Sequence, residues 1–151
     1  MDNNMSVRIY KEVHFDASHR LLNYDGKCAR LHGHRWRTEV WLEGNVDAGT
    51  QILIDYNCIK KLVECYDHQV ILNADDPMVE CLSQFQDVVT TQGDPTSELL
   101  TVEIADMIDE ACRSMGLDCR VAKVRVWAVS YTHLRAHETV LDLVCRLLLE
   151  K

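Results

Sequence analysis

Three histidines are the residues whose types and spacing point most directly to chemistry. His32 and His34 are separated by Gly33, and side chains two residues apart on an extended chain point to the same side. His19 directly follows a segment with strand alternation, so a hairpin would bring it near the other two. Three neutral imidazoles with an open fourth position are typical of a catalytic zinc site rather than a closed structural one. The alternative is three ordinary histidines, because a His-x-His pair alone often arises by chance.

Cys28, four residues before His32, is open to three interpretations. As a fourth zinc ligand it would close the site and make it structural. As a buried packing residue it would have no chemical role. As a thiol near a divalent cation it would have a lowered pKa, and its thiolate could move protons. The spacing leaves all three open.

Asp67 and His68 form an adjacent carboxylate and imidazole. A carboxylate can orient an imidazole and stabilise its charged form, which suits a proton relay. The alternative is an exposed pair in a loop. Taken by themselves the two residues favour the loop interpretation.

Hydrophobic periodicity indicates the elements that must position these residues. Alternation predicts strands over three segments, residues 7–15, 34–42 and 121–127. Helical spacing predicts one helix from an Asp55 N-cap to about Tyr66. A second helix is predicted to begin with Asp94 as its cap and Pro95 in its first turn, and to stop at Gly116. This order predicts an α+β fold in which two helices pack on one face of an antiparallel sheet.

Composition excludes several classes of protein. The chain has 151 residues, 47% of them hydrophobic and 26% charged, which fits one globular domain. A net charge of −8 argues against broad nucleic-acid binding. No segment is apolar enough for a membrane span, and the N-terminus lacks a signal-peptide pattern, so no membrane partner is expected. Seven scattered cysteines without a Cys-x-x-Cys pair predict reduced thiols and a cytoplasmic location.

Five short segments, in order between residue 7 and about residue 127, carry a family resemblance. They are residues 15–21 (FDASHRL), 27–34 (KCARLHGH), 54–56 (IDY), 66–69 (YDHQ) and 94–98 (DPTSE). Together they resemble the family of 6-pyruvoyl-tetrahydropterin synthases and 6-carboxy-tetrahydropterin synthases (QueD). A cysteine followed by three residues and then His-Gly-His is more similar to the QueD branch.

The resemblance implies a role for each matching residue. It implies that His19, His32 and His34 bind Zn²⁺ and that Cys28 is the catalytic thiolate. Asp67 and His68 would correspond to the family's proton relay. Thr96 and Ser97 would bind the pterin at the start of the second helix, where free backbone N–H groups favour acceptors.

The resemblance also implies a reaction and an assembly. The substrate would be the small molecule 7,8-dihydroneopterin triphosphate. The products would be 6-carboxy-5,6,7,8-tetrahydropterin, acetaldehyde and triphosphate, a step toward queuosine and other deazapurines. The subunit would have the tunnelling fold, and its copies would form a homo-oligomer, commonly a hexamer, with active sites between subunits.

The sequence departs from the family pattern in two places. After the strand that ends near Trp127 the family has a glutamate that anchors the pterin ring, and here residues 128–130 are Ala, Val and Ser. We therefore divide the chain into a pterin synthase-like domain, residues 1–128, and a foreign tail, residues 129–151. Residues 130–139 resemble a tail found on unrelated sequences, as though translated from adapter DNA. Residues 75–92 are longer than in compact relatives, and we interpret them as a surface elaboration with strand character at 88–91.

Two other functions fit the same residues. A pyruvoyl-forming synthase shares the site but loses triphosphate without cleaving the side chain, so it releases no acetaldehyde. A non-catalytic zinc or pterin-binding domain, made inert by its altered C-terminus, is the alternative outside enzyme chemistry.

Overall fold

The computed structural model describes residues 5–129, 149 and 150. In chain order its elements are β1 (Ser6–His19), the 3-10 turn η1 (Lys27–Ala29), β2 (His32–Asn45), α1 (Tyr56–Val63), the 3-10 turn η2 (Glu64–Tyr66), β3 (Gln69–Asn73), α2 (Met78–Leu82), β4 (Val88–Thr91), α3 (Ser97–Ser114), β5 (Cys119–Val129) and β6 (Leu149–Glu150). The three strands predicted from alternation are present as β1, β2 and β5. Each is longer than its alternating core, and β2 begins at His32 rather than His34.

The described strands form one mixed sheet in the order β4-β3-β1-β2-β5-β6. Its centre is antiparallel, because β2 pairs with β1 on one side and with β5 on the other. Beyond β1 the sheet continues with parallel pairs, β1 with β3 and β3 with β4. The predicted α+β class is confirmed, and its antiparallel sheet gains a parallel extension on the β3 side.

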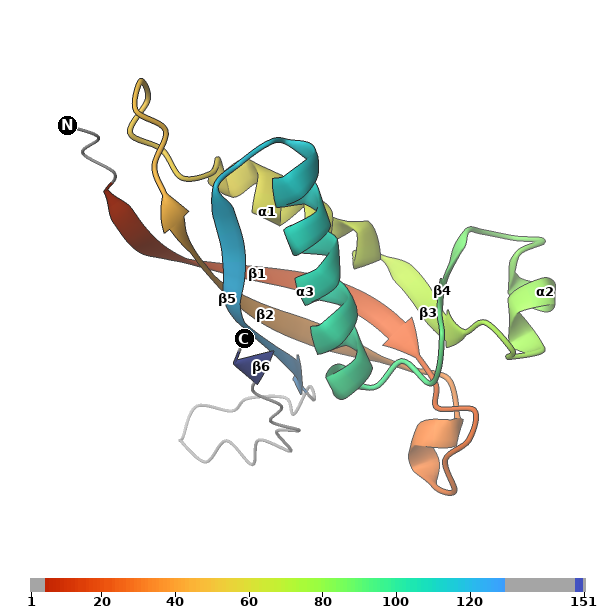
Figure 1. Ribbon diagram of the computed structural model, residues 1–151. Coiled ribbons are helices and arrows are strands. Elements are labelled where there is room, and N and C mark those ends of the chain that lie inside the picture. Colours follow the sequence, from red (N-terminus) through yellow and green to blue (C-terminus); the bar gives the residue numbers. More distant parts are fainter. Residues whose placement is uncertain (1–4, 130–148, 151) are drawn as a thin grey trace, which may run out of the picture.

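Helices α1 and α3 cover one face of this sheet (Figure 1). Apolar residues alternate along β1 and β2, so Val13, Phe15 and Trp36 face the helices and are buried. On α3 the residues Leu100 and Ile104 lie one turn apart and are fully buried against them. The core therefore lies between α1, α3 and the central strands, and it supports the strand ends that carry the histidines.

The helix boundaries are partly as predicted. Asp55 is the N-cap of α1, and its side chain accepts a hydrogen bond from the Asn57 backbone N–H at 2.8 Å. Asp94 was predicted to cap the second helix, and this is wrong. Thr96 is the cap of α3, with its hydroxyl accepting from the Leu99 N–H at 3.1 Å. Asp94 instead accepts hydrogen bonds from the backbone of Asn23 and the side chain of Asn73.

Strand β3 had no sequence prediction, and it changes the interpretation of the segment that follows. It places residues 74–93 beside the end of β1, where α2 and β4 form. The predicted strand at 88–91 is confirmed as β4. The interpretation as a surface elaboration is wrong for Asp76, which is 3% exposed and paired with Arg20.

Most of the predicted tail, residues 130–148 and 151, lies outside the described residues. Within it, Leu149 and Glu150 form β6, which pairs antiparallel with Val124 and Lys123 of β5. The domain boundary at residue 128 stays a prediction. Among the described residues no helix is long and apolar enough to cross a membrane.

Candidate functional site

The three predicted histidines converge where β1 ends and β2 begins. In the antiparallel register His19 lies directly opposite His32, and His34 lies opposite Ala17. The three side chains share one face of the sheet, because the pleat brings every second residue to the same side. One ring nitrogen of each residue lies within 4.8 Å of the corresponding nitrogen of the other two. Among the described residues this is the one cluster of His, Cys, Asp or Glu side chains whose geometry could hold a metal ion.

Backbone carbonyls orient two of these rings. His19 Nδ1 lies 2.7 Å from the Pro95 carbonyl oxygen, and His32 Nδ1 lies 2.6 Å from that of Arg30. A carbonyl only accepts, so each Nδ1 carries the proton and each Nε2 keeps a free lone pair. His19 Nε2 is buried and has no hydrogen-bond partner in the described part of the chain. A metal ion would satisfy this orphaned acceptor, and the three imidazoles form a donor set that suits zinc.

Trp36 forms the floor of the cluster. Its ring is fully buried, lies edge-on to His19 at 4.9 Å between centroids, and lies 5.5 Å from His34. Its indole N–H donates to the Ala17 carbonyl at 3.2 Å, which ties it to β1. Sequence reasoning gave no role to Trp36 or to the Pro95 carbonyl. The alternation of β2 is the signal that could have placed Trp36 beneath the histidines.

Burial keeps two rings of the cluster, those of His19 and His34, neutral. It lowers the pKa of His19 to about 4, and the neighbouring His32 and His34 lower it further while the Pro95 carbonyl opposes the shift. Burial and His32 also lower the pKa of His34, against the opposing effect of the Val129 backbone. Neutral imidazole is the form that binds a metal, so the site is prepared for a cation at neutral pH.

Cys28 lies in the 3-10 turn η1, inside the loop that joins β1 to β2. Its thiol is partly buried and free, and its carbonyl accepts a hydrogen bond from the Leu21 N–H at 2.8 Å. The thiol is not one of the ligand atoms that converge within 4.8 Å. This weighs against a closed site of three histidines and one cysteine, and it leaves Cys28 beside an open site.

Asp67 and His68 lie at the start of β3, against the flank of β1. Asp67 Oδ1 accepts from the Asp16 N–H at 2.8 Å, and the His68 N–H donates to the Asp16 carbonyl at 2.7 Å. His68 Nδ1 lies 2.8 Å from Asp67 Oδ2, and this hydrogen bond and the carboxylate charge raise the pKa of His68. The His68 side chain is 81% exposed, and the residue has the left-handed φ of 57° that side chains rarely adopt. An exposed, oriented imidazole can exchange protons with a neighbouring group.

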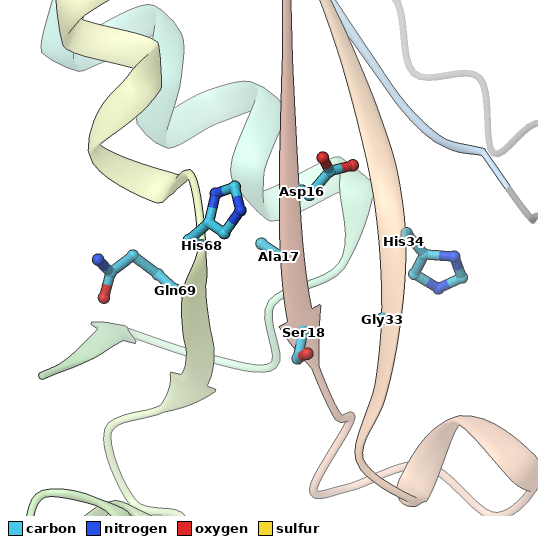
Figure 2. A pocket seen from close by; sticks show the side chains of 7 residues that line it. All are labelled: Asp16, Ala17, Ser18, Gly33, His34, His68 and Gln69. Atoms are coloured by element: carbon cyan, nitrogen blue, oxygen red, sulfur yellow. The ribbon is translucent and has the colours of Figure 1, made fainter. Parts of the chain in front are cut away.

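His68 of this pair and His34 of the histidine cluster line one open cavity within the chain. The cavity has a volume of about 370 Å³ and is also lined by Asp16, Ala17 and Ser18 of β1, Gly33 of β2, and Gln69. Figure 2 shows His68 on one side of β1 and the His34 ring extending from β2 away from it. Asp16, which holds His68, is three residues from His19, or roughly 10 Å along an extended strand.

Thr96 and Ser97 begin α3, one residue after the Pro95 carbonyl that holds His19. The Thr96 hydroxyl is used as the helix cap, and Ser97 is 7% exposed. The Pro95 carbonyl connects this helix end to the histidine cluster. Both hydroxyls also have roles in the helix end itself, so their contact with a pterin stays a prediction.

Comparison with known proteins connects this geometry to a family. The family profile described as 6-pyruvoyl tetrahydropterin synthase matches residues 8–137. The chain is 33% identical over 135 residues to a protein of Pyrococcus abyssi, covering 80% of this chain and 83% of the relative. It is 30% identical over 112 residues to the 6-carboxy-5,6,7,8-tetrahydropterin synthase of Rickettsia conorii, covering 68% of this chain and 80% of the relative.

Solved structures agree on the fold. An uncharacterized protein from Wolinella succinogenes superposes with a TM-score of 0.68 at 17% identity, covering 97% of this chain and 98% of the other. The 6-pyruvoyl tetrahydropterin synthase of Caenorhabditis elegans gives a TM-score of 0.59 at 21% identity, covering 100% of this chain and 99% of that one. At these identities the likeness establishes the fold alone.

Proposed function

Because the chain belongs to the 6-pyruvoyl tetrahydropterin synthase family, we propose that it is a zinc-dependent 6-carboxy-tetrahydropterin synthase. Its substrate is 7,8-dihydroneopterin triphosphate, and its products are 6-carboxy-5,6,7,8-tetrahydropterin, acetaldehyde and triphosphate. The name of the Rickettsia conorii relative and the Cys-x3-His-Gly-His pattern support the carboxy-forming branch.

The observation that carries this proposal is the buried histidine cluster. Three ring nitrogens converge within 4.8 Å, and the Nε2 of His19 is left without a partner among the described residues. His19, His32 and His34 would hold one zinc ion. When bound, that ion supplies Lewis acidity toward the hydroxyl groups of the substrate side chain.

Cys28 and His68 divide the proton transfers between them. The Cys28 thiolate takes a proton from the substrate side chain, and its place in the loop between β1 and β2, which carry the three histidines, supports this role. His68, held by Asp67 and exposed to solvent, returns a proton and exchanges with water. Thr96 and Ser97 bind the pterin ring at the start of α3.

The open cavity that His68 shares with His34 favours a homo-oligomer. Within one chain His68 is held at Asp16, roughly 10 Å along β1 from His19, and it points into an open cavity. A second copy of the chain would bring its own Asp67 and His68 to this cluster and close the site. The six described cysteines are free, which supports a reducing, cytoplasmic setting.

The first experiment is a turnover assay of the zinc-loaded chain with 7,8-dihydroneopterin triphosphate, following acetaldehyde and the pterin product. Acetaldehyde together with the carboxy-pterin is the expected result. Zinc binding without turnover would reject the activity for this chain and direct attention to residues 128–130, where the family has its pterin-anchoring glutamate. Restoring a glutamate by Ala128→Glu is then the repair to examine.

The pyruvoyl-forming reaction is the second candidate, favoured by the description of the matching family profile. A pyruvoyl product without acetaldehyde would assign the chain to that branch. Cys28→Ala separates both enzymes from a non-catalytic zinc domain. A catalytic site keeps its zinc and loses turnover in this variant, whereas a structural site that used the thiol loses zinc and fold together.

A further inference from the structure

The loop that carries Cys28, residues 20–31, is held together by contacts from its own first two residues. Leu21 N–H donates to the Cys28 carbonyl at 2.8 Å, and Arg20 Nη1 donates to the Ala29 carbonyl at 3.4 Å. These two contacts fix the carbonyl of the cysteine and that of the residue after it. The conformation of the turn therefore depends on where the Arg20 guanidinium lies.

Asp76 determines the position of that guanidinium. Arg20 Nε lies 2.5 Å from Asp76 Oδ2 and Arg20 Nη2 lies 2.8 Å from Asp76 Oδ1, which is a two-point contact that fixes the plane of the group. Asp76 is itself fixed, because its N–H donates to the Asn73 carbonyl at 2.9 Å and its Oδ1 accepts from the Met78 N–H at 2.8 Å. Figure 1 shows η1 and the α2 segment at the same end of β1.

The burial of this ion pair indicates that Asp76 positions other groups and does not contact a substrate. The Asp76 side chain is 0% exposed and that of Arg20 is 21% exposed. Burial alone would raise the pKa of Asp76, but the Arg20 guanidinium and the Met78 N–H hold it below its ordinary value, so the carboxylate stays charged. A side chain with no exposed surface cannot touch a substrate, so any effect of Asp76 on catalysis must act through the groups that it contacts, which are Arg20 and the backbone of Asn73 and Met78.

We propose that Asp76 is a positioning residue that acts through Arg20 to hold the Cys28 turn beside the three histidines. The segment of residues 74–93 is then part of the architecture of the site. This inference rests on the proposed function for the role of the Cys28 thiol. It adds a chain of structural contacts that does not include the metal ligands. The chain runs from Asp76 to Arg20 and from Arg20 to the Ala29 carbonyl.

The test is Asp76→Asn in the full-length, zinc-loaded chain. The amide has nearly the same shape and can still accept through its oxygen, but its NH₂ group faces an N–H donor where the carboxylate had a second acceptor. We expect kcat to fall by about 10- to 100-fold, as for other supporting contacts of a site, with KM and zinc stoichiometry unchanged.

Asp109→Asn is the matched control. Asp109 also holds a backbone group, because its Oδ1 accepts from the Val121 N–H at 2.7 Å. It lies toward the C-terminal end of α3, whereas Thr96 caps the N-terminal end. It undergoes the same chemical change and should leave kcat at the wild-type value. An equal fall in both variants would show general loosening of the fold and overturn the proposal.

Alkylation of Cys28 gives a readout that does not need turnover. With iodoacetamide and peptide mapping, Cys28 should react faster in Asp76→Asn because the turn that partly covers it has loosened. Cys65 is exposed and serves as an internal reference whose rate should not change. Equal Cys28 rates in wild type and variant would reject the positioning role.

The alkylation experiment also separates this inference from the proposed function. A chain without turnover whose Cys28 still responds to Asp76→Asn would refute the enzyme assignment and retain the positioning contact. Should Asp76→Asn fail to fold, Arg20→Lys takes its place. Lysine keeps the charge but cannot contact both Asp76 oxygens and the Ala29 carbonyl with one planar group. Faster Cys28 alkylation in Arg20→Lys supports the proposal, and an unchanged rate rejects it.

Discussion

Two histidine-bearing regions of the molecule have opposite environments. The metal cluster of His19, His32 and His34 lies on the helix-covered face, with His19 only 6% exposed and oriented by a backbone carbonyl. The relay pair of Asp67 and His68 lies at the start of β3, with the His68 side chain 81% exposed and oriented by a carboxylate. A histidine ring is thus oriented by a neutral acceptor in the first region and by a charged acceptor in the second.

The difference explains how one residue type can serve two chemical roles. Burial lowers the pKa of His19 to about 4, so its ring is neutral and free to bind a cation. The hydrogen bond and charge of Asp67 raise the pKa of His68, so its ring holds a proton at a higher pH than an ordinary histidine. The first environment suits a metal ligand, and the second suits a proton carrier.

Removing a ring from the metal cluster should have the largest effect. In His19→Ala we expect zinc stoichiometry to fall to near zero and kcat to fall by more than about 100-fold, since even supporting contacts of metal sites are worth that much. Metal analysis of the purified chain and the turnover assay measure the two effects. Full zinc occupancy in His19→Ala would contradict the assignment of the cluster.

Acid should destabilise the metal-free chain through the same cluster. The pKa of His19 is about 4 in the folded chain and 6.5 in its ordinary state, so the unfolded chain binds more protons between these values. Stability should therefore be full above pH 6.5 and decline as the pH falls toward 4. The shift corresponds to roughly 3 kcal/mol. Urea unfolding of the metal-free chain across this range measures the decline.

Added zinc sharpens this second prediction. Zinc binds the neutral rings and releases protons, so the zinc-loaded chain should gain most stability over the metal-free chain at neutral pH and least near pH 4. A gain that is the same at both pH values would mean that zinc does not bind through these imidazoles.

Removing the relay ring should reduce turnover and leave metal binding intact. In His68→Ala we expect kcat to fall by about 100-fold, the lower range for a lost general acid or base, with one zinc still bound. His14→Ala is the matched control, because His14 is a second histidine beside a carboxylate, with its Nε2 lying 2.6 Å from Glu12. Equal losses of kcat in the two variants would assign the effect to surface charge rather than to a relay.

The metal cluster was more predictable from the sequence than its surroundings. His32 and His34 follow from the period of two in a strand, and His19 follows from a hairpin between neighbouring segments. These are local rules, and the register of β1 with β2 bears them out. The class of the fold followed in the same way from the alternating and helical segments.

The contacts that hold the site come from residues far apart in the chain. Arg20 and Asp76 are separated by 56 positions, and no periodicity connects them. Asp76 reaches Arg20 because β3 pairs parallel with β1, and the short apolar run of Gln69–Asn73 gives no alternation to predict that strand. The cap of α3 was misplaced for a related reason, because Asp94 is used by Asn23 and Asn73 and the helix begins at Thr96.

The smallest expected effect comes from removing the charge of Asp67, which tests whether that charge sets the His68 region apart from the buried histidines. Asp67→Asn keeps the Oδ1 acceptor for the Asp16 N–H but replaces the Oδ2 acceptor of His68 Nδ1 with a donor. The pKa of His68 should fall toward its ordinary value, and kcat at neutral pH should fall by about tenfold, less than in His68→Ala, because the ring remains in place. Proton NMR of the His68 ring across pH measures the shift, with Glu12→Gln as a variant that should leave His68 unchanged. An unaltered titration of His68 would mean that solvent screens the Asp67 charge completely, and the two histidine regions would then differ in burial alone.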